Sequence, residues 1–242
     1  KIEDTPEVLQ ESGDVELLDI SCRDTLQVGV ENEDTTCLET DTINTSTITN
    51  MEGVFGSCAL FNSNISNWIV SNVTLMTSAL AGCTIFNNGY ASGVVNQLPW
   101  NTSACTSMNG MFAYCPAFNS NLGIGTTPWD VNKVITFSSM FQGATNFNNG
   151  NNSAPINNWN INTISSVSMV GMFNNTSMFN QDISSWNVSQ VTTMGGMFAY
   201  ASVFNQPLTN WERIGSTLAN VTNMENMFLS CPSFNQSIGN WN

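Results

Sequence analysis

Two rows of large apolar residues recur seven times in this chain at one unvarying separation, and this regularity limits what the chain can fold into. Each occurrence ends in a Phe-Asn dipeptide, and another large apolar residue stands six positions before its phenylalanine. The dipeptide phenylalanines are Phe61, Phe86, Phe118, Phe147, Phe179, Phe204 and Phe234; their partners are Phe55, Leu80, Phe112, Phe141, Phe173, Phe198 and Phe228. Successive occurrences lie 25 to 32 residues apart, so one segment of the repeat is fixed and another accepts insertions.

Tryptophan forms a further row, with one member in each unit. Its members are Trp68, Trp100, Trp129, Trp159, Trp186, Trp211 and Trp241, and the consensus that follows reads Trp-x-x-x-x-Val-x-x-Met-x-x-Met-Phe, with extra residues in two units. A unit of this size is too small to bury its own apolar face, so neighbouring units must stack and share a core. We therefore predict that the Trp, Met and Phe rows pack together as a core and hold no cofactor.

The repeat predicts a solenoid over residues 48–242, with a short parallel strand and a turn or short helix in each coil. Short parallel strands are expected near Val73–Met76, Val191–Met194 and Val221–Met224, followed by a tight turn or one helical turn at Met-Phe. Parallel strands lie about 4.8 Å apart, so seven coils would form a rod or shallow arc about 30–35 Å long. The chain stops at Asn242 in the middle of a unit.

Charge separates an N-terminal region from the repeats. The net charge is −14, and residues 1–47 hold thirteen acidic and two basic residues but no copy of the repeat. We predict that this region is a polar cap on the core; alternatives are a partly disordered acidic tail or a docking element for another subunit. Four basic residues in the whole chain argue against nucleic acid and anionic membranes as partners. No apolar run approaches the roughly 20 residues of a membrane span.

The sequence argues against catalysis. It contains no histidine, which removes the usual Ser-His and Cys-His systems and the commonest metal ligand. No glycine-rich phosphate loop or Gly-x-Ser-x-Gly elbow is present, and the five acidic residues of the repeats are scattered among units. We predict a protein that is not an enzyme and has no catalytic, cofactor or metal site.

The asparagines of the Phe-Asn dipeptides form a row of their own. We expect each side chain to bond turn backbone and stacked copies to bond one another, with ligand contact as the alternative.

Sequons and cysteines together indicate a secreted, glycosylated chain. The chain begins at Lys1 without a signal-like segment, so we expect either that a targeting peptide has been removed or that this is a fragment. The predicted glycan sites are Asn44, Asn64, Asn72, Asn101, Asn151, Asn174, Asn175, Asn187 and Asn220. Asn174 and Asn175 overlap and are expected to share one glycan. Asn235 also lies in a sequon, but it belongs to the Phe-Asn row and should be bare if that row is internal.

The cysteines are interpreted through the repeat. Three residues after the first aromatic position stand Cys58, Cys83, Cys115, Ala144, Thr176, Ala201 and Cys231, a row that we expect to be small and buried. The preferred disulfides are Cys22–Cys37, Cys58–Cys83 and Cys105–Cys115; Cys83–Cys115 is equally allowed by coil spacing, and buried thiols are the alternative. Cys231 is left over, which predicts an intermolecular bond or a partner on a further coil.

Two segments carry a family resemblance, one from Met197 to Gln206 and the other from Phe179 to Ser189. They resemble the repeat of the DUF285, or BspA-like, surface-protein family, over about residues 48–242. The resemblance implies a leucine-rich-repeat-like solenoid displayed outside the cell, with roles in adhesion or surface structure and without catalytic residues. The second unit departs from the pattern, with Ala79-Leu80 in place of Met-Phe, and several units carry insertions.

Two non-enzymatic functions follow. The favoured one is a glycosylated structural subunit of a surface layer, appendage or filament, self-associating by stacking of solenoid ends. The alternative is an adhesin or recognition module that binds protein or carbohydrate through one face.

Overall fold

The computed structural model describes residues 45–92, 94–122, 129–151, 156, 159–161, 166–212, 218–239 and 241. Almost all of the predicted cap therefore lies outside the described residues. So do the predicted Cys22–Cys37 disulfide and the predicted glycan site Asn44.

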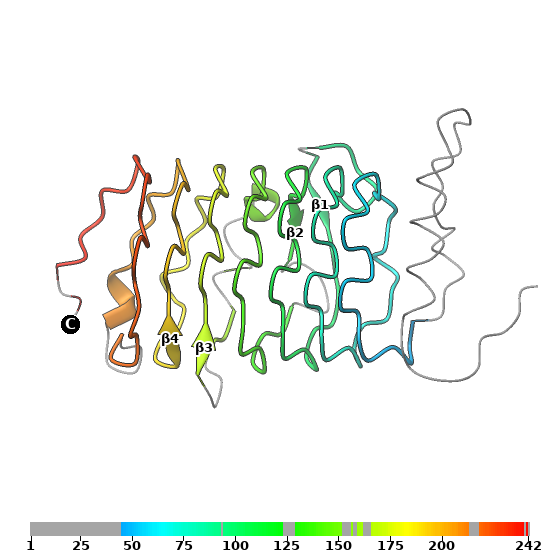
Figure 1. Cartoon of the computed structure of the whole chain (residues 1–242), viewed down its shortest axis with the longest axis horizontal. Helices are drawn as coiled ribbons and strands as arrows, with labels where there is room; N and C mark the ends of the chain where they lie inside the picture. The colour runs from blue at the N-terminus through cyan, green and yellow to red at the C-terminus, as the bar shows by residue number, and fades with distance from the viewer. Residues whose placement is uncertain are drawn as a thin grey trace, which may run out of the picture.

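Successive repeat units lie side by side along the long axis of the molecule, in the order of the sequence (Figure 1). A ladder of parallel bridges joins them through Asn50, Leu75, Ser107, Thr136, Ser168, Thr193 and Asn223. Strand β3 (Val167–Ser168) and strand β4 (Val191–Thr193) lie on this ladder and pair in parallel, with a register shift between them. A strand was predicted at Val73–Met76, but only Leu75 of this stretch forms a bridge. The backbone turns again at Ser78, which keeps the extended stretch short.

The segment around each Met-Phe pair is a run of tight turns, and we call this part of each coil the turn side. Two residues four positions apart adopt positive φ in every unit: Gly53 and Ser57, Ser78 and Gly82, Gly110 and Tyr114, Ser139 and Gly143, Gly171 and Asn175, Gly196 and Tyr200, Asn226 and Ser230. Turn bonds such as Cys58 N to Phe55 O alternate with bonds to the next coil, such as Phe55 N to Ala79 O. The turn side therefore uses backbone groups to join coils.

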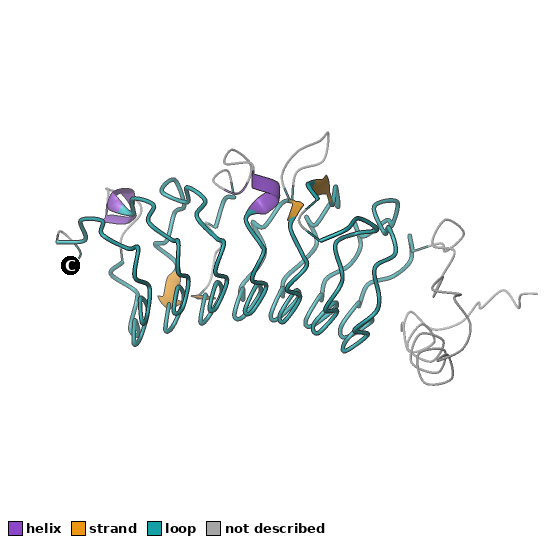
Figure 2. Ribbon diagram, turned by 90° about the horizontal axis from the view of Figure 1, so that it is seen from above, coloured by secondary structure: helices purple, strands orange, loops and turns teal. Residues whose placement is uncertain are grey.

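The remainder of each coil runs from the Phe-Asn dipeptide to tryptophan, and we call it the return side. Strand β1 (Asn96–Gln97) and strand β2 (Ser120–Asn121) pair in parallel here. The 3-10 segments η3 (Asn149–Asn151) and η4 (Thr209–Glu212) also belong to it. Figure 2 shows β1, β2, η3 and η4 along the side of the molecule opposite the tight turns. The β1–β2 pair was not predicted, because β1 lies in an insertion that the consensus does not cover.

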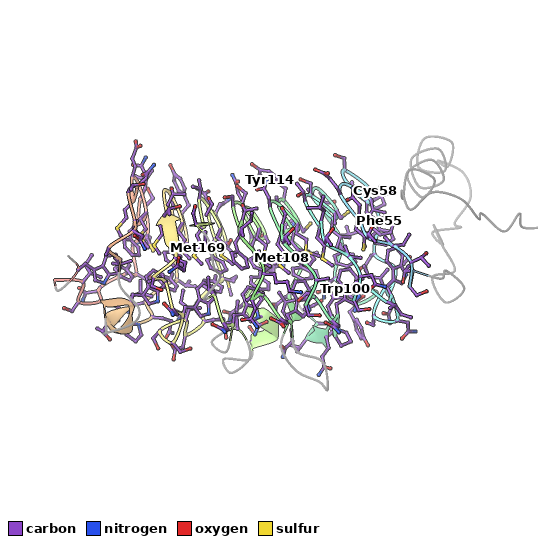
Figure 3. The ribbon with its side chains drawn as sticks, turned by 90° about the horizontal axis from the view of Figure 1, so that it is seen from below. Phe55, Cys58, Trp100, Met108, Tyr114 and Met169 are labelled. Carbon is purple, nitrogen blue, oxygen red and sulfur yellow. The ribbon has the colours of Figure 1, made fainter. Side chains whose placement is uncertain are left out.

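The aromatic rows fill the space between the two sides, and Figure 3 shows Phe55, Trp100, Met108 and Met169 inside the coils. Phe112 stacks on Phe118 of its own unit with 4.0 Å between ring centroids, and on Phe141 of the next unit at 5.7 Å. Trp100 and Trp129 stack across units at 6.2 Å. These side chains are almost completely buried, as predicted for a core. In the last described unit the corresponding rings are only half-buried: Phe228, Phe234 and Trp241.

Candidate functional site

The Phe-Asn asparagines form a continuous hydrogen-bonded row on the return side, which we call the amide ladder. Asn62 Oδ1 accepts from the backbone N–H of Asn87 at 2.7 Å, and Asn87 Oδ1 accepts from Asn119 N at 3.0 Å. The same contact joins Asn119 to Asn148, Asn148 to Asn180, Asn180 to Asn205 and Asn205 to Asn235, at 2.8–3.0 Å. Stacked copies therefore bond one another as predicted, with a side-chain oxygen on one coil and a backbone N–H on the next.

Indole N–H groups make a second set of bonds between coils, which the sequence analysis did not anticipate. Trp100 Nε1 donates to Ile65 O at 3.0 Å, and Ile65 O also accepts from Trp68 N of its own unit. Trp129, Trp186 and Trp211 donate in the same way to Leu98 O, Ile156 O and Ile183 O. The sequence did contain a signal for these bonds. The motif Ile-x-x-Trp recurs, and the N–H of a buried indole requires an acceptor.

The cysteine row is small and buried, as predicted, but its thiols do not form the expected pairs. The predicted pairs Cys58–Cys83 and Cys105–Cys115 are thiols in this structure and not disulfides. Cys83 Sγ donates to Phe55 O at 3.1 Å, and Cys115 Sγ donates to Leu80 O at 2.9 Å. Each of these two thiols thus points at a carbonyl of the preceding coil, a role that Thr176 Oγ1 fills towards Phe141 O. The position of these cysteines in the repeat predicted that their side chains are buried, but it did not predict where their sulfur atoms point.

Cys105 belongs to a different part of the coil from Cys115. It occupies a valine position, and its Sγ donates to Ser107 O beside the bridge ladder. Burial raises the pKa of Cys105 and of Cys115 to about 12, with backbone hydrogen bonds opposing the rise. Cys231 Sγ donates to Ala201 O at 3.0 Å, and burial raises its pKa as well. The predicted intermolecular bond of Cys231 stays a prediction.

The predicted glycan sites within the described residues lie at the surface or close to it. Asn64, Asn72, Asn101, Asn151, Asn175 and Asn220 are exposed, whereas Asn174 and Asn187 are half-buried. Asn72 and Asn220 both donate through Nδ2 to a serine carbonyl of the preceding coil, at 2.8 and 2.7 Å. Asn235 is exposed because the last described coil leaves its row uncovered. Occupancy of these sites stays a prediction.

A groove runs over the outside of the turn side across the last four described coils. Its volume is about 420 Å³. Its floor consists of residues with little or no side chain, namely Gly171, Gly195, Gly196 and Ala199. Val170, Tyr200 and Leu229 border it with exposed apolar groups, and its polar groups come from Gln142, Asn174, Asn223, Glu225 and Asn226. Among these residues, Asn174 was predicted as a glycan site, but the groove itself was not predicted, because it depends on where neighbouring coils lack side chains.

Within the part of the chain that the structure describes, no cluster of three or more His, Cys, Asp or Glu side chains is arranged to hold a metal ion. No helix in the same residues is both long enough and apolar enough to cross a membrane.

The chain is a tandem-repeat protein whose consecutive coils share stacked rings and an amide ladder. A family model described as "Mycoplasma protein of unknown function, DUF285" matches residues 26–151 and 148–242, and the chain belongs to this family. The family predicted from the repeat is thereby confirmed, and the match begins within the range predicted as a cap. No curated protein and no solved structure matches the chain.

Proposed function

We propose that this protein is a secreted, glycosylated and non-enzymatic structural subunit of an extracellular assembly, built by end-to-end stacking of leucine-rich-repeat-like solenoid coils. The observation that carries the proposal is that neighbouring coils bury matching rings and repeat one pattern of hydrogen bonds, so that the face of one coil suits the face of another. Phe228, Phe234 and Trp241 are half-buried, whereas the matching Phe198, Phe204 and Trp211 are fully buried beneath that coil. Covering such rings with a further coil removes apolar surface from water, which favours association.

A second copy of this chain suits this face because the bonding pattern between coils repeats. Ile238 O accepts from Trp241 N, as Ile65 O accepts from Trp68 N. Ile65 O also takes the indole N–H of the following coil, so Ile238 O offers the same acceptor to another tryptophan. Trp68 Nε1, in the first described coil, is buried and has no acceptor among the described residues. Donor and acceptor therefore match in a head-to-tail contact, which extends without closing. In this contact residues 1–47 act as the docking element for another subunit, the alternative to a cap.

The exposed sequons support an extracellular role for such an assembly. Only 9% of the residues are charged, so charge contributes little to the solubility of the exterior. Exposed sequons at Asn64, Asn72, Asn101 and Asn220 supply positions at which glycans would hydrate the sides of the stack. The glycans would then keep the lateral surfaces of neighbouring stacks apart, while the end faces associate.

Particle mass against protein concentration tests the proposal, measured on full-length glycosylated protein by light scattering and electron microscopy. We expect mass to rise with concentration and to stay low in the variant Phe228→Glu, which places a charge on the uncovered face. Tyr90→Glu is the matched control, because Tyr90 is exposed outside this face and the variant should assemble like the wild type. A wild-type protein that stays monomeric at high concentration without reductant would exclude assembly.

The second candidate function is recognition of an external ligand. The groove on the turn side favours it, because the groove combines an aromatic ring, amides and a carboxylate over a floor of small residues. Convergent polar groups in a hollow are typical of binding sites.

A further inference from the structure

We infer that the groove on the turn side binds a short, neutral oligosaccharide. The inference rests on the recognition candidate and is independent of end-to-end assembly. It is carried by the shape of the groove, by the chemistry of its polar groups and by the position of Tyr200.

The shape of the groove calls for an elongated ligand. Its lining comes from four consecutive coils, with Gln142 on the first, Asn174 on the second, Tyr200 on the third and Glu225 on the fourth. Coils joined by parallel bridges lie about 4.8 Å apart, so these residues span about 14 Å along the axis. This length and a volume of about 420 Å³ fit several linked sugar rings better than a single ion or monosaccharide.

The floor is hollow because glycines occupy adjacent positions on neighbouring coils. Gly171 and Gly196 adopt φ of +61° and +62°, a region that favours glycine. A Cβ on Gly195 would contact Asn223 Oδ1 at 3.4 Å, and a Cβ on Gly196 would contact Asn174 Nδ2 at 3.6 Å. Side chains at these positions would therefore intrude on the amides. The glycines leave the amide groups accessible to a ligand that lies flat on the floor.

The polar groups of the groove suit hydroxyl partners. Amides both donate and accept, and a carboxylate accepts two hydroxyl hydrogens, which matches adjacent hydroxyls on a sugar ring. Gln142 Nε2 donates to Tyr114 OH at 3.0 Å, which orients its Oε1 as an acceptor. Asn223 Oδ1 accepts from Glu225 N at 2.8 Å, and this bond fixes the turn that carries the carboxylate. The hydrogen-bonding groups are therefore held in place before a ligand arrives.

Tyr200 supplies an apolar surface beside these polar groups. It is 49% exposed and stands at a position of positive φ, 62°, where glycine is found in two other coils. A bulky residue in this region is strained, and strained positions gather at functional sites. An exposed aromatic ring can cover the C–H face of a sugar while its rim and the neighbouring amides bond the hydroxyls.

Anionic sugars and peptides suit the groove less well. Glu225 is the carboxylate among the lining residues, and no basic side chain lines the groove to compensate an anionic ligand. A peptide would need free backbone groups to pair with. However, Gly171 N already donates to Gly195 O at 2.9 Å, and Gly196 N donates to Glu225 O at 2.8 Å. The floor thus offers a peptide little main-chain recognition.

Titration calorimetry with cellopentaose, chitopentaose, mannopentaose and laminaripentaose tests the inference. Protein is used both as secreted and after enzymatic removal of N-glycans, because Asn174 lies in the groove and belongs to a sequon. At least one pentasaccharide should bind, with Kd of about 1 mM or tighter. Tyr200→Gly removes the ring and relieves the backbone, and it should weaken binding about tenfold. Glu225→Ala should weaken it to a similar degree.

Tyr90→Gly is the matched control, because Tyr90 is a tyrosine of similar exposure, 45%, that does not line the groove. It should leave binding within about twofold of wild type. The inference is overturned if none of the four sugars binds either form of the protein, or if Tyr90→Gly weakens binding as much as Tyr200→Gly. Groove binding by a random heptapeptide library without sugar binding would also overturn it. Particle mass, measured in parallel, reports assembly separately.

Discussion

The turn side and the return side of each coil are both hydrogen-bonded to the neighbouring coil, but through different chemical groups. On the turn side, coils are joined by backbone groups at alternate residues, as in Gly110 N to Ser138 O at 2.8 Å and Phe112 N to Met140 O at 2.9 Å. On the return side, single side chains reach across, as in Asn119 Oδ1 to Asn148 N and Trp129 Nε1 to Leu98 O. Backbone hydrogen bonds between coils require each residue of one coil to face the matching residue of the next coil. A side-chain hydrogen bond constrains only the two residues that it joins. The separation of six residues is therefore invariant, and the rest of the unit varies in length.

A pair of single-residue insertions gives the largest expected difference between the two sides. An alanine inserted after Ala113 shifts the turn side out of register and orphans several N–H groups. At about 1–3 kcal/mol for each buried group, stability should fall by about 3 kcal/mol or more. A glycine inserted after Ser92, an exposed residue of the return side, lengthens a loop and should cost about 0.6 kcal/mol or less. Urea unfolding followed by tryptophan fluorescence measures both, and equal losses would contradict the comparison.

A single substitution can remove one acceptor from the amide ladder. Asn119 is buried, and its Oδ1 accepts from Asn148 N at 2.8 Å and from Gly150 N at 3.0 Å. Asn119→Ala leaves both donors without this acceptor and should reduce the free energy of unfolding by about 1–3 kcal/mol. Asn235→Ala, in the same row but exposed, should change stability by about 0.5 kcal/mol or less. If the two variants lose the same stability, the ladder does not support the return side.

The indole bonds can be tested with two tryptophans that differ in one contact. Trp129 and Trp159 are each 4% exposed and stack on one another at 6.4 Å. Trp129 Nε1 donates to Leu98 O at 2.7 Å, whereas Trp159 Nε1 has no acceptor among the described residues. Trp129→Phe should therefore destabilise the protein more than Trp159→Phe, by about 1 kcal/mol in chemical denaturation. A larger loss for Trp159→Phe would show that ring packing outweighs the hydrogen bond.

The last expected effect is absent at neutral pH, appears only at high pH and concerns a buried thiol. The folded state raises the pKa of Cys115 from 9.0 to about 12, chiefly by burial. The protonated thiol therefore contributes stability that is complete below pH 9 and is lost as pH rises towards 12. Wild type should lose more stability than Cys115→Ala between about pH 8 and about pH 10.5, in urea unfolding with reductant present. Parallel losses in the two proteins would exclude the thiol as the source.

Sequence patterns located the buried positions well and the polar contacts only in part. The Phe, Met and Trp rows were predicted as core because burial follows from apolar residues at a fixed spacing. Bonding between stacked asparagines was predicted from identical residues at identical positions. The direction of each cysteine thiol was not, because a place in a buried row does not determine which neighbouring atom Cys83 Sγ and Cys115 Sγ contact. The groove was not predicted because its polar residues come from several repeat positions and do not form one row in the sequence.

The sequence by itself determined the unit, the order of the units and which side chains are removed from water. These properties are local: a separation of six residues and a row of tryptophans require only the hydrophobic effect and identical neighbours. The tertiary structure alone decided which carbonyl each indole and thiol bonds, and where adjacent glycines leave a hollow beside Tyr200. Such contacts join residues about 30 positions apart, and their geometry depends on how far one coil is displaced along the next.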